Sequence, residues 1–210
     1  NTKIIISQKP EKITIDYFST RFNVNNKIYS IPLLGEHQAD NAALAIQAVR
    51  IFKPKLNYNI ISDGLFNTVW PGRFHLLDKK LPIFYDVAHN QAGINSIRNT
   101  LKYLNAHKKV GLIILKEDKD IDNIARSLNG LFNELIVSTI PDSQLMGINK
   151  LFSYLNHNNI KCKTVNPIEK AFKYMSNQAE QGAISIIFGS HYAAKSIYKF
   201  FEINFDNVTI

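Results

Sequence analysis

The stretch Leu81-Pro-Ile-Phe-Tyr-Asp-Val-Ala-His-Asn90 decides the fold. Residues 81–85 form a short apolar run of strand-forming residues. Directly after the stretch, apolar residues recur at the spacing of one helix face, at positions 94, 97, 101 and 104. The sequence therefore predicts a strand, a polar turn and a helix at this point.

The polar turn carries three side chains of interest, Asp86, His89 and Asn90. Ligands of open α/β sheets bind beyond the carboxyl ends of the strands, and the N–H groups at a helix start favour anions. These residues are therefore candidates for a binding site. The alternative is that Asp86 or Asn90 caps the helix, as residues of these types commonly do.

Strand-like and helical patterns alternate through the rest of the chain. Strands are predicted at residues 74–77, 81–85, 110–115, 135–138, 163–165 and 183–188. Helices are predicted at residues 92–104, 121–131, 144–156, 168–178 and 191–201. This alternation indicates βαβ units and an α/β fold with a mainly parallel, doubly wound sheet.

The first third of the chain has a different pattern. Strands are predicted at residues 4–6, 13–18, 22–24 and 27–31, with Asn25-Asn26 as a hairpin turn. Two helices are predicted, at residues 42–52 and 58–67, and the first has a face of small residues at Ala42, Ala45, Ala48 and Val49. Pro71-Gly72 marks a turn or linker, so we place a domain boundary after residue 70.

The composition is that of an ordinary globular protein. The chain has 210 residues, 45% of them hydrophobic, and a formal net charge of +8. No apolar run approaches the roughly 20 residues that cross a bilayer, and no leader pattern is present. We therefore expect a soluble, cytoplasmic protein without a membrane partner. The lysines are scattered rather than gathered into a stripe with aromatic residues, so a solvated basic surface is favoured over nucleic-acid binding.

Cys162 is the single cysteine, and it forms neither an intramolecular disulfide nor a cysteine zinc cluster. The histidines show no spacing typical of metal ligands, so we predict no metal ligand in this chain. The chain opens at Asn1 without an initiator methionine. We therefore expect it to be a fragment of a longer protein.

Four short motifs occur in a recognisable order. They are Gly35-Glu-His-Gln-x-x-Asn41-Ala42, Trp70-Pro-Gly-Arg73, Asp86-Val-Ala-His-Asn90 and Ile187-Phe-Gly-Ser190. Together they resemble the C-terminal half of the folylpolyglutamate synthase family, within the Mur-type ATP-dependent amide ligases. The form Asp-Val-Ala-His-Asn is most similar to the bifunctional dihydrofolate synthase/folylpolyglutamate synthases.

The resemblance implies a specific domain organisation. Residues 71–210 would form a Rossmann-like C-terminal ligase domain. Residues 1–70 would be the C-terminal β-rich and helical portion of a P-loop ATPase domain, the central domain of Mur ligases. ATP and L-glutamate would bind in a cleft between the two domains, where the hinge arginine and the Asp86–His89 turn would converge.

The resemblance also implies residue roles. Asn41 would contact the adenine, Arg73 the nucleotide phosphates and Asp86 the ribose. His89 and Ser190 would lie at the glutamate end, and Arg73 and His89 would be the catalytic residues. Similar enzymes phosphorylate a carboxylate of the pterin substrate, and the amino group of L-glutamate attacks the acyl phosphate. Such chemistry needs cations around the transferring phosphoryl group.

Each assigned residue also has a structural alternative. Asn41 and Ser190 could be helix caps, Arg73 could stack on Trp70, and His37 and Gln38 could brace the turn before the helix. The charged segment at residues 116–120 could lie near the site or be a solvated loop.

The sequence lacks one feature of the family and departs from others. No Gly-x-x-x-x-Gly-Lys-Ser/Thr loop is present, so the triphosphate cradle and the Mg²⁺ ligands are expected upstream of this segment. Val87, Gln91 and His191 stand where the family has other residues. We expect the fragment to be monomeric and inactive alone. The alternatives are another Mur-type ligase acting on cell-wall precursors, and a non-catalytic α/β binding module.

Overall fold

The chain divides into two compact units, and each has a hydrophobic core of its own. The computed structural model describes residues 4–141 and 144–204. The first unit contains residues 1–70 and the short segment Asn99–Leu104, and the second contains Pro71–Arg98 and residues 105–210. The chain thus passes from one unit to the other at Trp70-Pro71.

The first unit contains a three-stranded antiparallel sheet. Its strands are β1 (Glu11–Ile15), β2 (Thr20–Val24) and β3 (Lys27–Ile31), in that order across the sheet. Asn25 and Asn26 have φ values of 54° and 58°, the left-handed conformation that a two-residue hairpin requires, so the predicted turn is confirmed. The strand predicted at residues 4–6 is wrong, because this segment pairs with no other strand and Ile4 and Ile6 are exposed.

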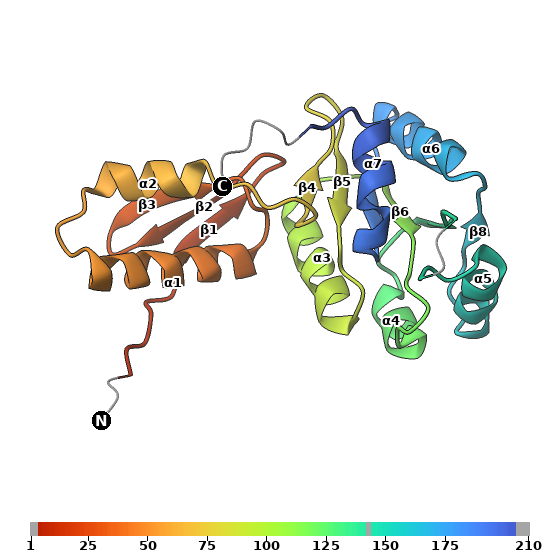
Figure 1. Ribbon diagram of the computed structural model, residues 1–210, viewed down its shortest axis with the longest axis horizontal. Helices are drawn as coiled ribbons and strands as arrows, with labels where there is room; N and C mark the ends of the chain where they lie inside the picture. Colours follow the sequence, from red (N-terminus) through yellow and green to blue (C-terminus); the bar gives the residue numbers. More distant parts are fainter. Residues whose placement is uncertain (1–3, 142–143, 205–210) are drawn as a thin grey trace. The chain divides into compact units, whose positions relative to one another are not determined.

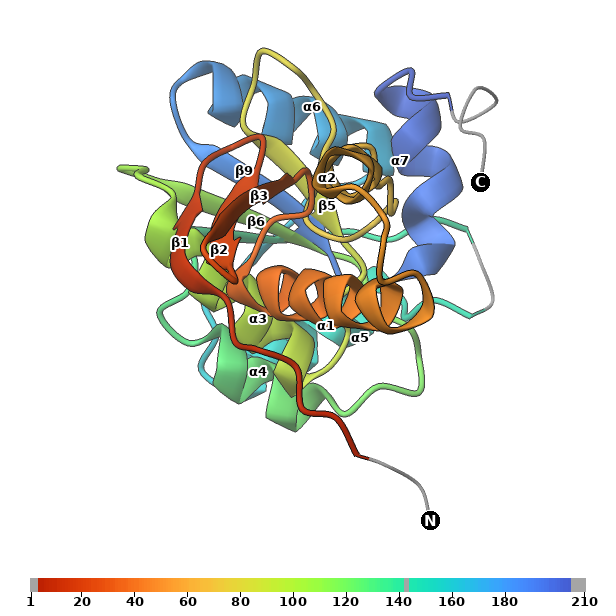
Figure 2. The same ribbon diagram turned by 90° about the vertical axis from the view of Figure 1, so that its left-hand side faces the viewer.

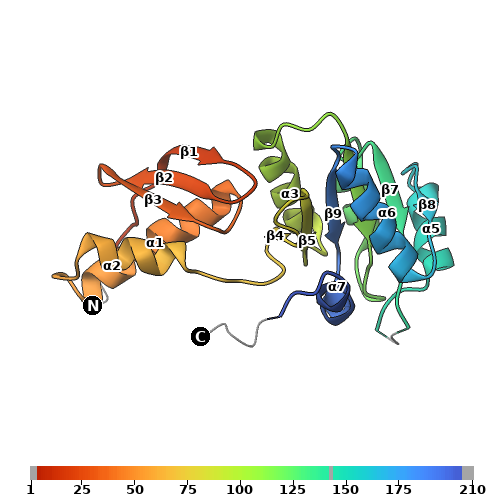
Figure 3. The ribbon, with the colours of Figure 1, turned by 90° about the horizontal axis from the view of Figure 1, so that it is seen from above.

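Two helices, α1 (Glu36–Phe52) and α2 (Tyr58–Phe66), pack against one face of this sheet (Figure 3). The first helix starts six residues before the predicted position 42, because Gly35, with φ of 127°, ends the preceding loop and the polar residues that follow form the first turns. The predicted face is confirmed in part, since Ala42 is buried and Val49 packs against the core, whereas Ala45 and Ala48 are exposed. The residues of α1 that reach the core are Ala39, Ala42, Ala43 and Ile46.

The second unit is an α/β domain with a six-stranded sheet (Figure 1). Its strands are β4 (His75–Leu76), β5 (Ile83–Asp86), β6 (Lys109–Ile113), β7 (Glu134–Val137), β8 (Lys163–Thr164) and β9 (Ile184–Phe188). Its helices are α3 (Gln91–Tyr103), whose residues 99–103 group with the first unit, α4 (Ile121–Leu128), α5 (Ile148–His157), α6 (Ile168–Glu180), the 3₁₀ turn η1 (His191–Ala193) and α7 (Ala194–Phe200). The strand order is β4-β5-β9-β6-β7-β8, and every pairing except that of β4 is parallel.

Helices cover both faces of this sheet, because crossovers of one hand that move in opposite directions place their helices on opposite faces. Three crossovers move in one direction across the sheet, and the fourth returns to insert β9 between β5 and β6. Figure 2 shows α6 and α7 on one side of the sheet and α3, α4 and α5 on the other. Side chains alternate accordingly along β5, where Ile83 and Tyr85 belong to the core beneath α6 and α7.

The predicted α/β class, with a mainly parallel and doubly wound sheet, is therefore confirmed. The helix ends differ from the predicted ones, most clearly in three helices. The predicted helix 121–131 stops at Leu128, that at 144–156 begins at Ile148, and that at 191–201 begins with a 3₁₀ turn before α7. Among the described residues, no helix has both the length and the apolar character needed to span a bilayer.

Candidate functional site

The candidate site lies at the carboxyl edge of the sheet in the second unit. The register aligns Asp86, the last residue of β5, with Phe188, the last residue of β9. Because β4 is antiparallel and places His75 opposite Tyr85, the residues that lead into β4, Arg73 among them, lie toward the same edge. The structure thus brings Arg73, Asp86, His89 and Ser190 to the carboxyl ends of two neighbouring strands.

Asp86 binds two backbone N–H groups from different segments. Phe74 donates to its Oδ2 at 2.8 Å, and Ala88 donates to its Oδ1 at 2.7 Å. The Asp86 side chain therefore joins the segment before β4 to the turn after β5. The alternative that Asp86 caps α3 is wrong, because neither donor belongs to the helix.

Asn90 is the residue that caps α3. Its Oδ1 accepts a hydrogen bond from the backbone N–H of Gly93 at 2.9 Å, which satisfies one of the donors at the helix start. The capping alternative is confirmed for this residue.

Burial raises the pKa of Asp86 to about 6, although the N–H groups of Phe74 and Ala88 and the charge of Arg73 act to lower it. Desolvation disfavours the charged form, and these donors and Arg73 offset only part of that cost. The carboxyl group therefore changes its charge just below neutral pH. A carboxyl group with such a shifted pKa, at the carboxyl edge of a parallel sheet, is typical of functional sites.

His89 is oriented by a local contact. Its Nδ1 lies 2.8 Å from the carbonyl oxygen of Val87, and because a carbonyl only accepts, Nδ1 carries the proton that is donated. The ring is partly exposed, and its Nε2 has no partner among the residues that the structure describes. This nitrogen can therefore accept from or donate to a ligand, depending on its protonation.

Ser190 is nearly enclosed, with 3% of its surface exposed. Its Oγ accepts from the backbone N–H of Tyr192 at 3.2 Å, so it caps the 3₁₀ turn as the alternative suggested. Its carbonyl oxygen accepts from the buried hydroxyl of Tyr85 at 2.8 Å. The hydroxyl hydrogen of Ser190 is still able to donate to a ligand.

Sequence reasoning missed the importance of Gly189. This residue has φ of 118°, and a Cβ at this position would lie 2.2 Å from the carbonyl oxygen of Ile114. Only glycine allows the chain to leave β9 so close to the end of β6. A glycine directly after a predicted buried strand was the available signal.

The charged segment at residues 116–120 has both of the properties considered for it. Lys116 lies 6.0 Å above the ring of Tyr192, two residues after Ser190, so one end of the segment is near the site. The segment also makes interactions at the surface, which include ion pairs of Lys116 with Asp118 and of Lys150 with Glu117.

Asn41 lies in the first unit, inside α1 rather than at its start. Its Nδ2 donates to Oε1 of Gln38 at 3.2 Å. The alternative that Asn41 is a helix cap is therefore wrong. Gln38 and His37 lie in the first turn of α1 and not before it, and Gln38 is buried. The contact of Asn41 with adenine and the stacking of Arg73 on Trp70 stay predictions.

Within residues 4–141 and 144–204, no three His, Cys, Asp or Glu side chains are grouped so that they could hold a metal ion. The chemistry available at the carboxyl edge is instead that of an exposed guanidinium, an imidazole, a carboxyl group and a hydroxyl. These groups suit anionic ligands such as phosphates and carboxylates.

The chain has relatives among known proteins. No protein-family model matches the chain. The dihydrofolate synthase/folylpolyglutamate synthase of Mycobacterium tuberculosis is 33% identical over 121 residues, which cover 55% of this chain and 25% of that protein. The enzyme of the same name from Bacillus subtilis is 27% identical over 187 residues, which cover 85% of this chain and 43% of that protein. The chain thus spans less than half the length of these relatives.

Solved structures show the same fold. Folylpolyglutamate synthase of Mycobacterium tuberculosis, complexed with ADP and AMPPCP, matches with a TM-score of 0.81 at 23% identity over 93% of this chain and 48% of that one. A bifunctional folylpolyglutamate synthase/dihydrofolate synthase with Mn, AMPPNP and L-glutamate bound matches with a TM-score of 0.69 at 20% identity, over 88% of this chain and 44% of that one. The UDP-N-acetylmuramate-alanine ligase of Thermotoga maritima matches with a TM-score of 0.66 at 19% identity, over 92% and 44%.

The sheet topology and these structural matches therefore show that the chain has the fold of the Mur-type ligases. Within this class, the chain is similar to the C-terminal half of the dihydrofolate synthase/folylpolyglutamate synthases, as its motifs indicated.

Proposed function

We propose that this chain is part of an ATP-dependent amide ligase that adds L-glutamate to dihydropteroate or to a reduced folate through an acyl phosphate. The observation that carries the proposal is that Arg73, Asp86, His89 and Ser190 lie at one edge of the sheet. The relatives of the chain are named dihydrofolate synthase/folylpolyglutamate synthase. Residues 1–70 would be the end of the ATP-binding domain and residues 71–210 the C-terminal ligase domain. We expect a cytoplasmic monomer.

Arg73 is proposed to bind the nucleotide phosphates. Its guanidinium is exposed at the sheet edge and offers a fixed fork of donors that matches phosphate oxygens. The next residue, Phe74, is held by Asp86 through the hydrogen bond of 2.8 Å. Asp86 thereby positions Arg73. The lone pairs of the Asp86 carboxylate that Phe74 and Ala88 do not use can accept a hydrogen bond from a ribose hydroxyl.

His89 and Ser190 are proposed to receive L-glutamate. Nε2 of His89 would contact the amino acid, and the hydroxyl of Ser190 would donate to one of its carboxylates. Holding the amino acid in a fixed position beside the acyl phosphate lowers the barrier to amide formation, because the two reactants no longer have to meet by diffusion.

In the proposed reaction, a carboxylate oxygen of the pterin substrate attacks the γ-phosphorus of ATP and ADP leaves. The amino nitrogen of L-glutamate then attacks the acyl carbon, loses a proton and expels inorganic phosphate. Arg73 would stabilise the negative charge that develops on the phosphoryl oxygens. The Mg²⁺ ligands are proposed to lie with the phosphate-binding loop in another part of the full-length enzyme.

Binding can be tested on the chain itself by NMR. Titration of ATP, and separately of L-glutamate, should shift the amide resonances of Asp86 and Ser190, and ATP should also shift that of Asn41. The chain should make no ADP when ATP, dihydropteroate and L-glutamate are supplied together. Production of ADP would contradict the fragment interpretation, and unchanged spectra at saturating ligand would favour a non-catalytic module.

The substrate is tested in the full-length parent protein. It should consume ATP with dihydropteroate as acceptor and not with a UDP-linked cell-wall precursor. The opposite result would favour the alternative that the fold similarity to UDP-N-acetylmuramate-alanine ligase suggests, a Mur-type ligase of cell-wall synthesis. Arg73→Met should lower kcat/KM by on the order of 100-fold, because a transition-state cation is lost.

A further inference from the structure

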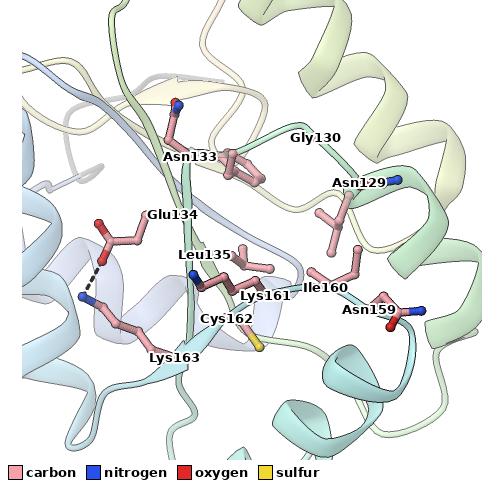
Figure 4. Close-up of a pocket in the computed structure, with 12 residues that line it drawn as sticks. Asn129, Gly130, Asn133, Glu134, Leu135, Asn159, Ile160, Lys161, Cys162 and Lys163 are labelled. Atoms are coloured by element: carbon pink, nitrogen blue, oxygen red, sulfur yellow. Dashed lines mark ion pairs between the residues drawn. The ribbon is translucent and has the colours of Figure 1, made fainter.

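A cavity of about 420 Å³ lies at the amino-terminal edge of the sheet in the second unit, the edge opposite to that of Asp86 (Figure 4). Its walls are the first residues of β7, the loop that follows α4 and the segment that leads into β8. Cavities of this volume are typical of sites for small molecules. None of the residues assigned to the ligase reaction lines it.

One wall of the cavity is apolar. Leu128, Leu135 and Ile160 line it and are themselves buried, so their side chains are already held in place by the core. Phe132 also lines the cavity, and its ring stacks on that of Phe188 at a centroid distance of 5.4 Å. This wall offers a rigid surface to the flat or apolar part of a ligand.

The negative charge of Glu134, at one end of the cavity, is already balanced by neighbouring groups. Lys163 forms an ion pair with it, Lys108 lies 3.0 Å from its Oε2, and the hydroxyl of Tyr174 donates to its Oε1 at 2.7 Å. Desolvation acts to raise the pKa of Glu134, but these hydrogen bonds outweigh it and lower the pKa to about 2. Glu134 is therefore ionised, and its charge is balanced by two lysines.

Lys161 provides a further positive charge. It lies between the Glu134–Lys163 pair and the other end of the cavity, and no ion pair joins it to any of the described residues (Figure 4). The three lysines 108, 161 and 163 outnumber the single carboxylate of Glu134. The side-chain amides of Asn129 and Asn159 complete the opposite end with hydrogen-bonding groups.

From this combination we propose that the cavity is a second ligand site, which binds a small carboxylate with an aromatic or aliphatic body. The carboxylate pairs with Lys161, and the body packs on the wall formed by Leu128, Phe132 and Leu135. The site is independent of the ATP and glutamate edge, so it does not rest on the proposed ligase activity.

The proposal is tested with 1-naphthoate as probe and 1-naphthalenemethanol as its uncharged analogue, in the absence of ATP and L-glutamate. Titration of naphthoate into the 210-residue chain should shift the amide resonances of Gly130, Leu135 and Cys162 and leave those of Asp86 and Ser190 unchanged. Lys161→Met should weaken naphthoate binding about tenfold, equivalent to ~1.4 kcal/mol, without changing the binding of the alcohol. Lys170→Met, an exposed lysine of α6 outside the cavity, is the matched control and should change neither.

Cys162 supplies a second measurement, because it lines the cavity and is the single thiol of the chain. Naphthoate should slow its alkylation by N-ethylmaleimide, followed by mass spectrometry at about pH 8, where part of a thiol is ionised. Absence of both the shifts and the protection would overturn the site. Equal affinity for the acid and the alcohol, or equal effects of the two lysine substitutions, would overturn the assignment of a carboxylate ligand.

Discussion

Asp86 shows how one carboxyl group can position a segment that is remote in sequence. Phe74 has φ of 45°, a left-handed conformation that is unfavourable for a bulky residue. It is held there by the hydrogen bond to Asp86 and by its ring contact with Phe84 at 4.9 Å. The position of Arg73 therefore depends on a group whose charge changes near pH 6.

Arg73→Met should raise the pKa of Asp86 above the wild-type value of about 6, because Arg73 is one of the groups that lower it. The measurement is a ¹³C NMR titration of the Asp86 carboxyl carbon. Arg126→Met is the control, since this arginine makes its hydrogen bonds within α4. A pKa that is unchanged in the first variant, or raised equally in both, would show that Arg73 does not act on Asp86.

The same shift has a consequence for stability. The folded pKa of Asp86 lies above its ordinary value of 3.8, so the folded state binds the proton more tightly than the unfolded state. The contribution of this group to the free energy of unfolding is therefore largest below about pH 4 and decreases until about pH 6. Asp86→Asn should abolish this slope in urea unfolding followed from pH 4 to 7, and an identical slope in the variant would contradict the assignment.

Gly189→Ala should destabilise the second unit by more than ~3 kcal/mol, because the added Cβ would meet the backbone oxygen of Ile114 at 2.2 Å. Gly130→Ala is a matched control, since Gly130 also has positive φ but has open space around it. It should cost only ~1 to 2 kcal/mol, the penalty of the left-handed conformation. Urea unfolding of both variants compares the two, and equal losses would refute the steric explanation.

At the level of elements, α3 depends on its cap. Asn90→Ala removes the hydrogen bond to the N–H of Gly93 and should destabilise the fold by ~1 kcal/mol. Asn90→Asp keeps an acceptor at this position and should be close to wild type. Thermal unfolding compares the two, and a loss of equal size in both variants would mean that the cap is not the cause.

Element prediction succeeded where an apolar pattern was long and failed where polar residues carry the helix. The strands of the second unit and their intervening helices were predicted because burial on both faces gives continuous apolar runs. The start of α1 was missed because residues 36–41 are mostly polar. The helix begins there because Gly35 ends the preceding loop and Ala39 packs in the core. The apolar triplet at residues 4–6 was read as a strand, yet it has no partner strand.

For the whole molecule, the division at Trp70-Pro71 predicts two separately stabilised cores. Ile46→Ala, in the core of the first unit, should cost ~2 to 5 kcal/mol, and Phe172→Ala, in the core of the second, ~3 to 5 kcal/mol. Hydrogen exchange followed by mass spectrometry should show loss of protection mainly in the unit that carries the substitution. Equal loss in both units for either variant would show that they unfold as one.

The candidate site was partly predictable from the order of strands and turns along the chain. The sequence placed Asp86, His89 and Ser190 after strands, and a parallel sheet brings the ends of such strands to one edge. It did not show that Asp86 binds the N–H of Phe74, or that Asn90 and not Asp86 caps α3, because both depend on which donors lie within 3 Å after folding.

The sequence by itself determined the alternation of strands and helices, the hairpin at Asn25-Asn26 and the family that the motifs resemble, since these depend on local periodicity and residue type. Only the tertiary structure decided the position of β9 between β5 and β6, the raised pKa of Asp86 and the cavity beside Lys161. The physical reason is that strand order, desolvation and the shape of a cavity arise from contacts between residues that are distant in the chain.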